Sequence, residues 1–130
     1  MDGATTLFFD PAPPALPLYA ALEQRILSAH PDVRVKVQKT QLTLSARYGF
    51  CWAWLPQVRM PARREALLGV SFGLGERLDS PRILAAVEPY PARWTHHLLL
   101  GSLEELDEEL MSWLEAAYAF GNRPGRRRSS

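Results

Sequence analysis

The spacing of apolar residues changes along the chain, from helical near the N-terminus to alternating in the middle and back to helical at the end. Leu18, Leu22 and Ile26 recur every four residues, which is typical of the buried face of a helix. Proline suits an early helical position, so this helix is expected to begin near Pro17. It should end before Pro31, because the residue that precedes a proline disfavours helical geometry.

Between the two helical regions, large apolar residues alternate with polar or small residues in several short runs. Such alternation is typical of β-strands. The predicted strands cover residues 33–38, 41–45, 48–55, 68–74, 83–88 and 94–100. Pro89 and Pro91 are expected to end the fifth strand, and residues 56–64 should form a polar loop. Short connections between consecutive strands favour antiparallel pairing.

The clearest helical pattern lies near the C-terminus, where leucines recur at helical spacing from Leu103 to Leu114. Ser102 and Glu105 have the spacing of a capping box, in which two side chains bind backbone N–H groups at the start of a helix. Acidic residues crowd the first two turns, where the helix dipole favours negative charge. Gly121 is expected to cap the C-terminal end.

These elements predict the α+β class, with a mostly antiparallel sheet of about five to six strands. An N-terminal and a C-terminal helix should flank the sheet on one face, because a half-apolar sheet needs a cover for its core side. The expected organisation is an irregular lead-in over residues 1–15, a single domain over 16–121 and a disordered basic tail over 122–130.

Composition is consistent with a globular, cytoplasmic protein. Apolar residues make up 47% of the chain, and Cys51 is its only cysteine, so no intrachain disulfide can form. The first basic residue is Arg25, which leaves the N-terminus without the charged region of a signal peptide. No apolar run approaches the length of about 18 residues that a membrane span requires, so no membrane association is expected.

The charge is unevenly distributed. Arg123, Arg126, Arg127 and Arg128 are four of the 15 basic residues, so the other 11 are set against all 14 acidic residues and residues 1–122 carry about −3. A mildly acidic body argues against a dedicated nucleic-acid-binding domain, which usually has a basic face. Contact with nucleic acid is therefore expected only through the arginines of the tail.

Three segments carry a family resemblance. The string EPYPARWTHH runs from Glu88 to His97 and is followed by GSLEELDEEL from Gly101, while VQKTQLTLS runs upstream from Val37. Together they resemble a bacterial family of domains of unknown function, number 5655, which is similar in outline to YdhG-like domains. The resemblance implies a small α+β domain over roughly residues 7–120. It implies no activity, no cofactor and no catalytic residue.

Candidate chemical groups are few. His96 and His97 are adjacent on a strand, so their side chains should point to opposite faces and cannot easily share a metal ion. One is expected on the covered face or its rim, and the other on the open face. Cys51 lies in an aromatic strand and is expected to be a small buried hydrophobe rather than a nucleophile. No metal, no cofactor and no catalytic residue is therefore assigned.

A ligand site is predicted from the face that the helices leave open. If Trp52, Trp54, Val70 and Phe72 face the helices, the opposite face is small and polar with cationic edges. That face would carry Arg34, Lys36, Thr43, Ser45, Gly49, Cys51, Ala53, Gly69, Ser71 and Gly73. Small side chains leave room for a ligand, although antiparallel sheets often have a plain solvated face. The residues predicted to bind a ligand are Arg93, Trp94, Thr95, His96, His97, Lys39, Ser45 and Ser71.

Several functions remain open at this point. The first is a binding or interaction module without enzymatic activity, which holds a small anionic molecule or a protein segment. The second is a small enzyme that uses His96 or His97 as a general acid or base. The third is a nucleic-acid-associated protein that uses Arg126, Arg127 and Arg128. An exposed apolar patch would instead favour a protein partner or a homodimer. The sequence does not identify the ligand.

Overall fold

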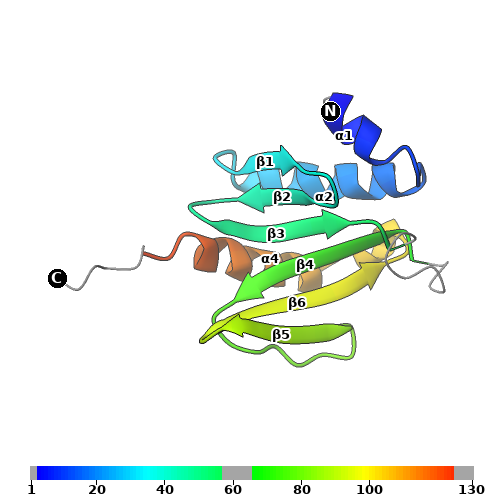
Figure 1. Cartoon of the computed structure of the whole chain (residues 1–130). Coiled ribbons are helices and arrows are strands. Elements are labelled where there is room, and N and C mark those ends of the chain that lie inside the picture. Colours follow the sequence, from blue (N-terminus) through cyan, green and yellow to red (C-terminus); the bar gives the residue numbers. More distant parts are fainter. Residues whose placement is uncertain (1–2, 57–65, 125–130) are drawn as a thin grey trace.

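Six strands form one antiparallel sheet in the order β1-β2-β3-β4-β6-β5 (Figure 1). The computed structural model describes residues 3–56 and 66–124, so residues 57–64 of the predicted polar loop lie outside the described residues. The strands are β1 (Arg34–Val37), β2 (Leu42–Ser45), β3 (Gly49–Trp54), β4 (Leu68–Leu74), β5 (Ala85–Tyr90) and β6 (Arg93–Leu100). The predicted antiparallel sheet is confirmed.

Two long helices, α2 and α4, lie behind the sheet in Figure 1, which confirms the α+β class with both helices on one face. The helical segments are α1 (Gly3–Phe8), α2 (Ala15–Ala29), the 3-10 helix η1 (Leu103–Glu105) and α4 (Glu108–Gly121). Among the described residues, no helix has the length and apolar character needed to cross a membrane.

The N-terminal segment is more ordered than expected. Residues 3–8 form helix α1, so the prediction of an irregular lead-in is wrong there. Phe9 follows this helix and is 1% exposed. Its ring lies 5.3 Å from that of Tyr19 in α2, which attaches the lead-in to the core. Helix α2 begins at Ala15 rather than near Pro17, which therefore occupies the first turn.

The start of the last helix also differs from the prediction. Ser102 precedes η1, and its side chain caps no backbone N–H group. Asp107 is the N-cap of α4, and its side chain accepts a 3.0 Å hydrogen bond from the N–H of Leu110. Glu105 instead accepts a 2.6 Å hydrogen bond from the N–H of Gly101. Asp107 caps the helix in place of Ser102 because its extended backbone directs the carboxylate to the free N–H groups at the start of α4.

Two predicted boundaries differ from the structure, one at the end of β5 and one at the end of α4. Pro89 lies within β5, which continues to Tyr90. The missing N–H of a proline is tolerated because β5 is an edge strand, and the pairing with β6 is irregular between Val87 and Tyr90. The tail was expected to begin at residue 122, but the N–H of Asn122 continues the hydrogen bonding of α4, and Arg123 packs on the body.

The sheet has a covered face and an open face. Phe72 stacks on Trp113 of α4 with ring centroids 6.0 Å apart, which identifies the covered face. Cys51 and Ala53 are register partners of Phe72 and Val70, and register partners share a face. Both lie on the covered face, so the prediction that they are open is wrong. Cys51 is fully buried, as expected.

The two tryptophans of β3 lie on the open face, contrary to the prediction. Trp52 is the register partner of Ser71, and Trp54 is the partner of Gly69. The small residues of β3 point to the core instead, which allows α4 to pack close to the strand. The other residues predicted for the open face lie on it, namely Arg34, Lys36, Thr43, Ser45, Gly49, Gly69, Ser71 and Gly73.

Candidate functional site

A row of residues crosses the open face at the centre of the sheet. Ser71 on β4 is the register partner of Trp52 on β3 and also of His97 on β6. Thr43 extends the row to β2, and Ala85 extends it to β5. Polar side chains from three strands, β2, β4 and β6, are thereby held in line with an indole ring on a rigid support.

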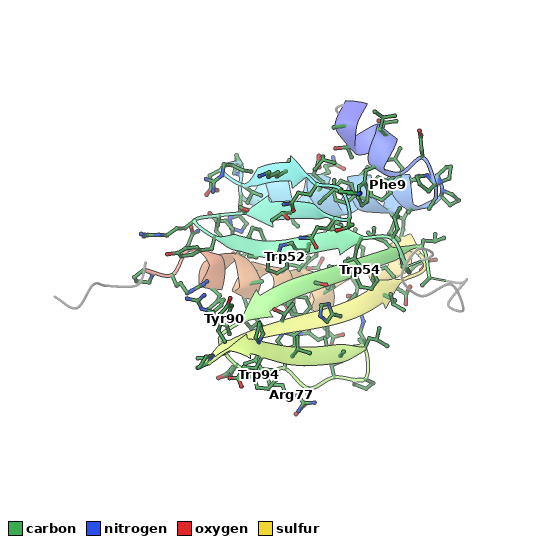
Figure 2. The ribbon with its side chains drawn as sticks, viewed as in Figure 1. Phe9, Trp52, Trp54, Arg77, Tyr90 and Trp94 are labelled. Carbon is green, nitrogen blue, oxygen red and sulfur yellow. The ribbon has the colours of Figure 1, made fainter. Side chains whose placement is uncertain are left out.

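The two indoles lie along the sheet rather than standing away from it (Figure 2). A Cβ atom at Gly69 would be 2.3 Å from the ring of Trp54, so this ring lies directly on the backbone of the glycine. The ring of Trp52 reaches toward Gly49 and Gly73, where added Cβ atoms would lie 3.2 Å and 4.0 Å from it. The absence of side chains at these positions makes space for both rings.

A depression of about 240 Å³ surrounds the centre of this row. It is lined by Gln41, Trp52, Trp54, Ser71, Thr95 and His97. Trp54 Nε1 donates a 2.9 Å hydrogen bond to Ser71 Oγ, which shares a 2.6 Å hydrogen bond with His97 Nδ1. This chain fixes the orientation of the His97 ring at the wall of the depression.

A second depression of about 300 Å³ adjoins the first. Trp52 and Thr95 line both, so we call the two depressions together the open-face groove. The walls of the second depression include Tyr48, Gly49, Tyr90, Arg93, Phe120 and Arg123. Its residues therefore come from β3, the β5–β6 hairpin and the end of α4.

Two arginines lie at this end of the groove. The guanidinium of Arg123 lies over the rings of Phe120 and Tyr48, 4.2 Å and 4.6 Å from their centroids. It also donates a 2.9 Å hydrogen bond to the carbonyl oxygen of Phe120. Arg93 lies over the ring of Tyr90 at 5.6 Å. These contacts hold both guanidinium groups on aromatic supports.

The electrostatics of the pair favour an anion. Burial lowers the pKa of Arg123, and the positive charge of nearby Arg93 lowers it further. Within residues 3–56 and 66–124, neither arginine forms an ion pair with a carboxylate. Two like charges close together repel each other, and an anion between them would relieve that repulsion.

A tight turn positions Arg93. Pro91 and Ala92 connect β5 to β6, and Tyr90 and Arg93 are register partners on either side of them. Ala92 has a φ of 61°, in the left-handed region that an alanine rarely adopts. Its N–H donates a 3.0 Å hydrogen bond to the Glu88 carboxylate, which supports this conformation. The turn presents the tyrosine and the arginine together at the end of the groove.

Across the described parts of the chain, no group of three His, Cys, Asp or Glu side chains is arranged to hold a metal ion. His96 and His97 point to opposite faces, as expected from strand geometry, because one pairs with Phe72 and the other with Ser71. The groove is instead equipped for hydrogen bonding, stacking and charge.

Comparison with known proteins places the chain in a family. A family model described as Domain of unknown function (DUF5655) matches residues 4–121, which is most of the chain. The chain belongs to this family. No curated protein and no solved structure shows a significant match. The expected likeness to YdhG-like domains is not confirmed.

Four of the residues predicted to bind a ligand come together in this DUF5655 domain. Arg93, Thr95 and His97 alternate along the open side of β6, and Ser71 is the partner of His97 on β4. All four line the open-face groove. Trp94 also contributes to the wall of the second depression, although β6 alternation assigns its side chain to the other face. Their role in binding remains a prediction.

His96 has a different environment from the other predicted residues. Its side chain is 0% exposed and stacks on Phe72 with ring centroids 5.0 Å apart. The N–H of Leu78 donates a 2.8 Å hydrogen bond to His96 Nε2, so this nitrogen must be unprotonated. Burial lowers the pKa of His96 and favours the neutral ring. This histidine belongs to the core and not to the groove.

The structure does not bring Lys39 and Ser45 into the groove. Lys39 is an exposed residue of the turn between β1 and β2. Ser45 lies on the open face at an irregularity between β2 and β3, outside the walls of both depressions. Both residues were predicted to lie near the site because the sequence indicates where strands occur, but it does not indicate the register between them.

Most of the aromatic residues of the groove and one of its arginines were not among the residues predicted to bind a ligand. Tyr48, Trp52, Tyr90, Phe120 and Arg123 all line it. One signal was available, because glycines at 49, 69 and 73 provide the small neighbours that flat indole rings require. No local pattern marks Arg123, which reaches the groove only through the packing of α4.

Proposed function

We propose that this domain binds a small anionic molecule in the open-face groove and acts as a binding module rather than as an enzyme. The observation that carries the proposal is the meeting of Arg93 and Arg123 at one end of the groove. The guanidinium fork matches the oxygens of carboxylates and phosphates. Here both guanidinium groups rest on aromatic rings, and neither pairs with a carboxylate in the described ranges.

The distribution of charge over the molecule supports an anionic ligand. The six strands contain a single acidic residue, Glu88, whose carboxylate accepts the N–H of Ala92. The acidic residues concentrate instead on η1 and α4, behind the sheet. An anion on the open face therefore meets arginines and few carboxylates.

The proposal is tested by titration with a simple anion. Inorganic pyrophosphate is the probe, and binding is measured by isothermal titration calorimetry at low ionic strength. We expect saturable binding that weakens about tenfold or more in Arg93→Gln and in Arg123→Gln, because a charged hydrogen bond to an anion contributes about 1.5–3 kcal/mol. Thermal melting checks that each variant is folded.

Arg77→Gln provides the matched control. Arg77 is an exposed arginine that pairs with Asp79 at 3.5 Å and lies over Trp94, and it is not part of the groove wall. Its removal lowers the net charge as much as the test variants do. If pyrophosphate does not bind the wild-type protein, or if all three variants weaken binding equally, the arginine pair is not a specific anion site.

A second candidate function rests on the contact between Ser71 and His97. Through the 2.6 Å hydrogen bond at the wall of the first depression, Ser71 orients the ring of His97. A histidine held in this way can act as a general acid or base. Ser71 itself is poorly placed as a nucleophile. It lies within β4, which is paired on both sides, so neighbouring N–H groups bond to other strands and offer no oxyanion hole.

Assay of the wild-type protein with chromogenic ester and phosphate substrates separates these two functions. Turnover that disappears in His97→Gln, with the fold retained, would favour the enzyme. His96 is excluded from this role because it is buried on the covered face. Absence of turnover together with pyrophosphate binding favours the binding module.

Three further proposals concern nucleic acid, a protein partner and the location of the protein. Arg126, Arg127 and Arg128, the residues proposed to contact nucleic acid, lie outside the described residues. Val87 and Tyr90 are exposed along β5 and offer an apolar contact to a protein partner or to a second copy of the chain. A cytoplasmic location is a further proposal, which the single cysteine supports.

A further inference from the structure

We infer that the ligand carries a flat ring as well as its anionic group, in the manner of a nucleoside monophosphate. This inference rests on the proposed function, and it adds a ring to the anion that the arginines would hold. Three features of the groove carry it: the position of Trp52, the distance between the two ends of the groove, and the polar side chains at the end opposite the arginines.

Trp52 occupies the junction of the groove. It lines both depressions, and its side chain is only half-buried. Its ring extends over Gly49 and toward Gly73. An indole that lies along the sheet offers the flat face of its ring, rather than an edge, to a molecule in the groove. Flat faces of this kind bind heterocyclic rings by stacking.

The spacing of β6 separates two ends of the groove. Arg93, Thr95 and His97 alternate on the open side of one strand. Successive residues on one face are about 6.6 Å apart, so the backbone positions of Arg93 and His97 are separated by about 13 Å. Trp52 lies between these ends, since it is in the row of His97 and also contributes to the arginine end. A ligand that contacts both ends must be elongated, with its middle near the indole.

The end opposite the arginines is suited to the edge of a heterocycle. Ser71, His97 and Gln41 place a hydroxyl, an imidazole and an amide on the wall of the first depression. These groups both donate and accept hydrogen bonds, as the ring nitrogens and exocyclic groups of a nucleobase do. Trp54 Nε1 donates to Ser71 Oγ and thereby holds the hydroxyl in place.

The arginine pair favours a phosphate monoester over a carboxylate. A single carboxylate has two oxygens and is matched by one guanidinium fork, whereas a phosphate has three terminal oxygens and a charge near −2. Arg93 and Arg123 approach the groove from two elements, so one phosphate can accept from both. The arginines that line the groove gather at one end, which suits one terminal phosphate better than the extended backbone of a single-stranded nucleic acid.

The test compares ligands that share a phosphate and differ in the ring. Adenosine 5′-monophosphate, uridine 5′-monophosphate and ribose 5-phosphate are titrated against the full chain by calorimetry. We expect at least one nucleotide to bind about tenfold more tightly than ribose 5-phosphate, because stacking of a base contributes about 1–3 kcal/mol. Trp52→Leu should remove this advantage, so that the nucleotides and ribose 5-phosphate bind the variant with similar affinity, while Trp52→Phe should retain part of it.

An independent measurement covers the case in which Trp52→Leu does not fold. In the wild-type protein, the indole N–H resonance of Trp52 should shift on addition of the nucleotide and not on addition of ribose 5-phosphate. The resonance of Trp113, which stacks on Phe72 in the core, is the internal control.

The outcomes distinguish the inference from the function on which it rests. Equal affinity for ribose 5-phosphate and both nucleotides would contradict the inference that the ligand carries a ring, and it would be consistent with the proposed anion site. Failure of all three ligands and of pyrophosphate overturns both. Binding that appears only with oligonucleotides, and strengthens with their length, overturns the small ligand in favour of a nucleic-acid surface.

Discussion

The ring of Trp54 lies on the backbone of Gly69, so close that a Cβ atom at the glycine would be 2.3 Å from it. The two residues are register partners on β3 and β4. A glycine in the centre of a sheet usually weakens it, because it contributes no side chain to packing. Here the indole fills the place of the missing side chain, and its Nε1 is aimed at Ser71.

Gly69→Ala should therefore destabilise the fold. The added methyl group must displace the indole, and overpacking of this kind costs about 1–3 kcal/mol. Gly73→Ala is the control, since its methyl group would approach no atom more closely than 3.9 Å, and it should leave stability unchanged or raise it by up to about 1 kcal/mol. Urea denaturation gives both values. Equal stability of the two variants would show that Trp54 moves away at no cost.

His96 should make stability depend on pH. Burial lowers its pKa in the folded state below 6.5, so at mildly acidic pH the unfolded chain binds more protons than the folded chain. The free energy of unfolding should fall as pH drops below about 6.5, by at most about 1.4 kcal/mol per pH unit. His96→Gln can still accept the N–H of Leu78 through its amide oxygen and should show a weaker slope. Urea denaturation between pH 5 and 8 measures both proteins, and identical slopes would contradict the assignment.

Asp107 should stabilise the start of α4. It accepts hydrogen bonds from the N–H of Leu110 and from Arg82, and these lower its pKa in that order of effect. Asp107→Ala should lower the Tm more than Asp107→Asn, because asparagine is also a good N-cap. Glu104→Ala changes an exposed carboxylate of η1 and serves as the control. A Tm of Asp107→Ala equal to that of the control would mean that the cap adds nothing.

Cys51 should be unreactive in the folded protein. Its side chain is fully buried, and burial raises the pKa of the thiol to about 12. The thiolate is the reactive form, so Ellman's reagent at pH 8 should modify Cys51 only after urea is added. Rapid modification of the native protein would show that the strand opens or that the thiol is accessible.

The boundary of the C-terminal tail can be tested by two deletions. The side chain of Asn122 accepts a 3.1 Å hydrogen bond from the N–H of Arg47, and Arg123 packs on Phe120. Residues 125–130 include no apolar side chain. Removal of residues 125–130 should leave the Tm unchanged, whereas removal of 122–130 should lower it. A similar fall for both deletions would place stabilising contacts beyond Pro124.

The sequence predicted the elements of the fold well because each depends on a local pattern. The alternation around Val70 and Phe72 correctly identified both a strand and its covered side. The same rule failed for Trp52 and Trp54, which were assigned to the core because they are large. Their position depends on glycines in other parts of the sheet, and that relationship exists only once the register between strands is known.

The candidate site was predicted in part for the same reason. Arg93, Thr95 and His97 belong to one strand, so their alternation could be read directly from the chain. Arg123 was assigned to a disordered tail, because nothing near it in sequence indicates that α4 ends beside β3. Gly121 allows that approach, since a Cβ atom there would lie 2.9 Å from Phe50.

Among the described residues, the strands carry a single carboxylate and α4 carries several, although Arg25 and Arg82 pair with Glu108 and Glu109 at its start. The proposed anionic ligand would be attracted more strongly to the strands than to α4, and this attraction would guide its encounter with the groove. Attraction of this kind acts on the rate of association and is screened by salt over about 10 Å at 0.1 M. The association rate of the anion with the sheet should therefore fall as ionic strength rises, even where the lifetime of the bound complex changes little.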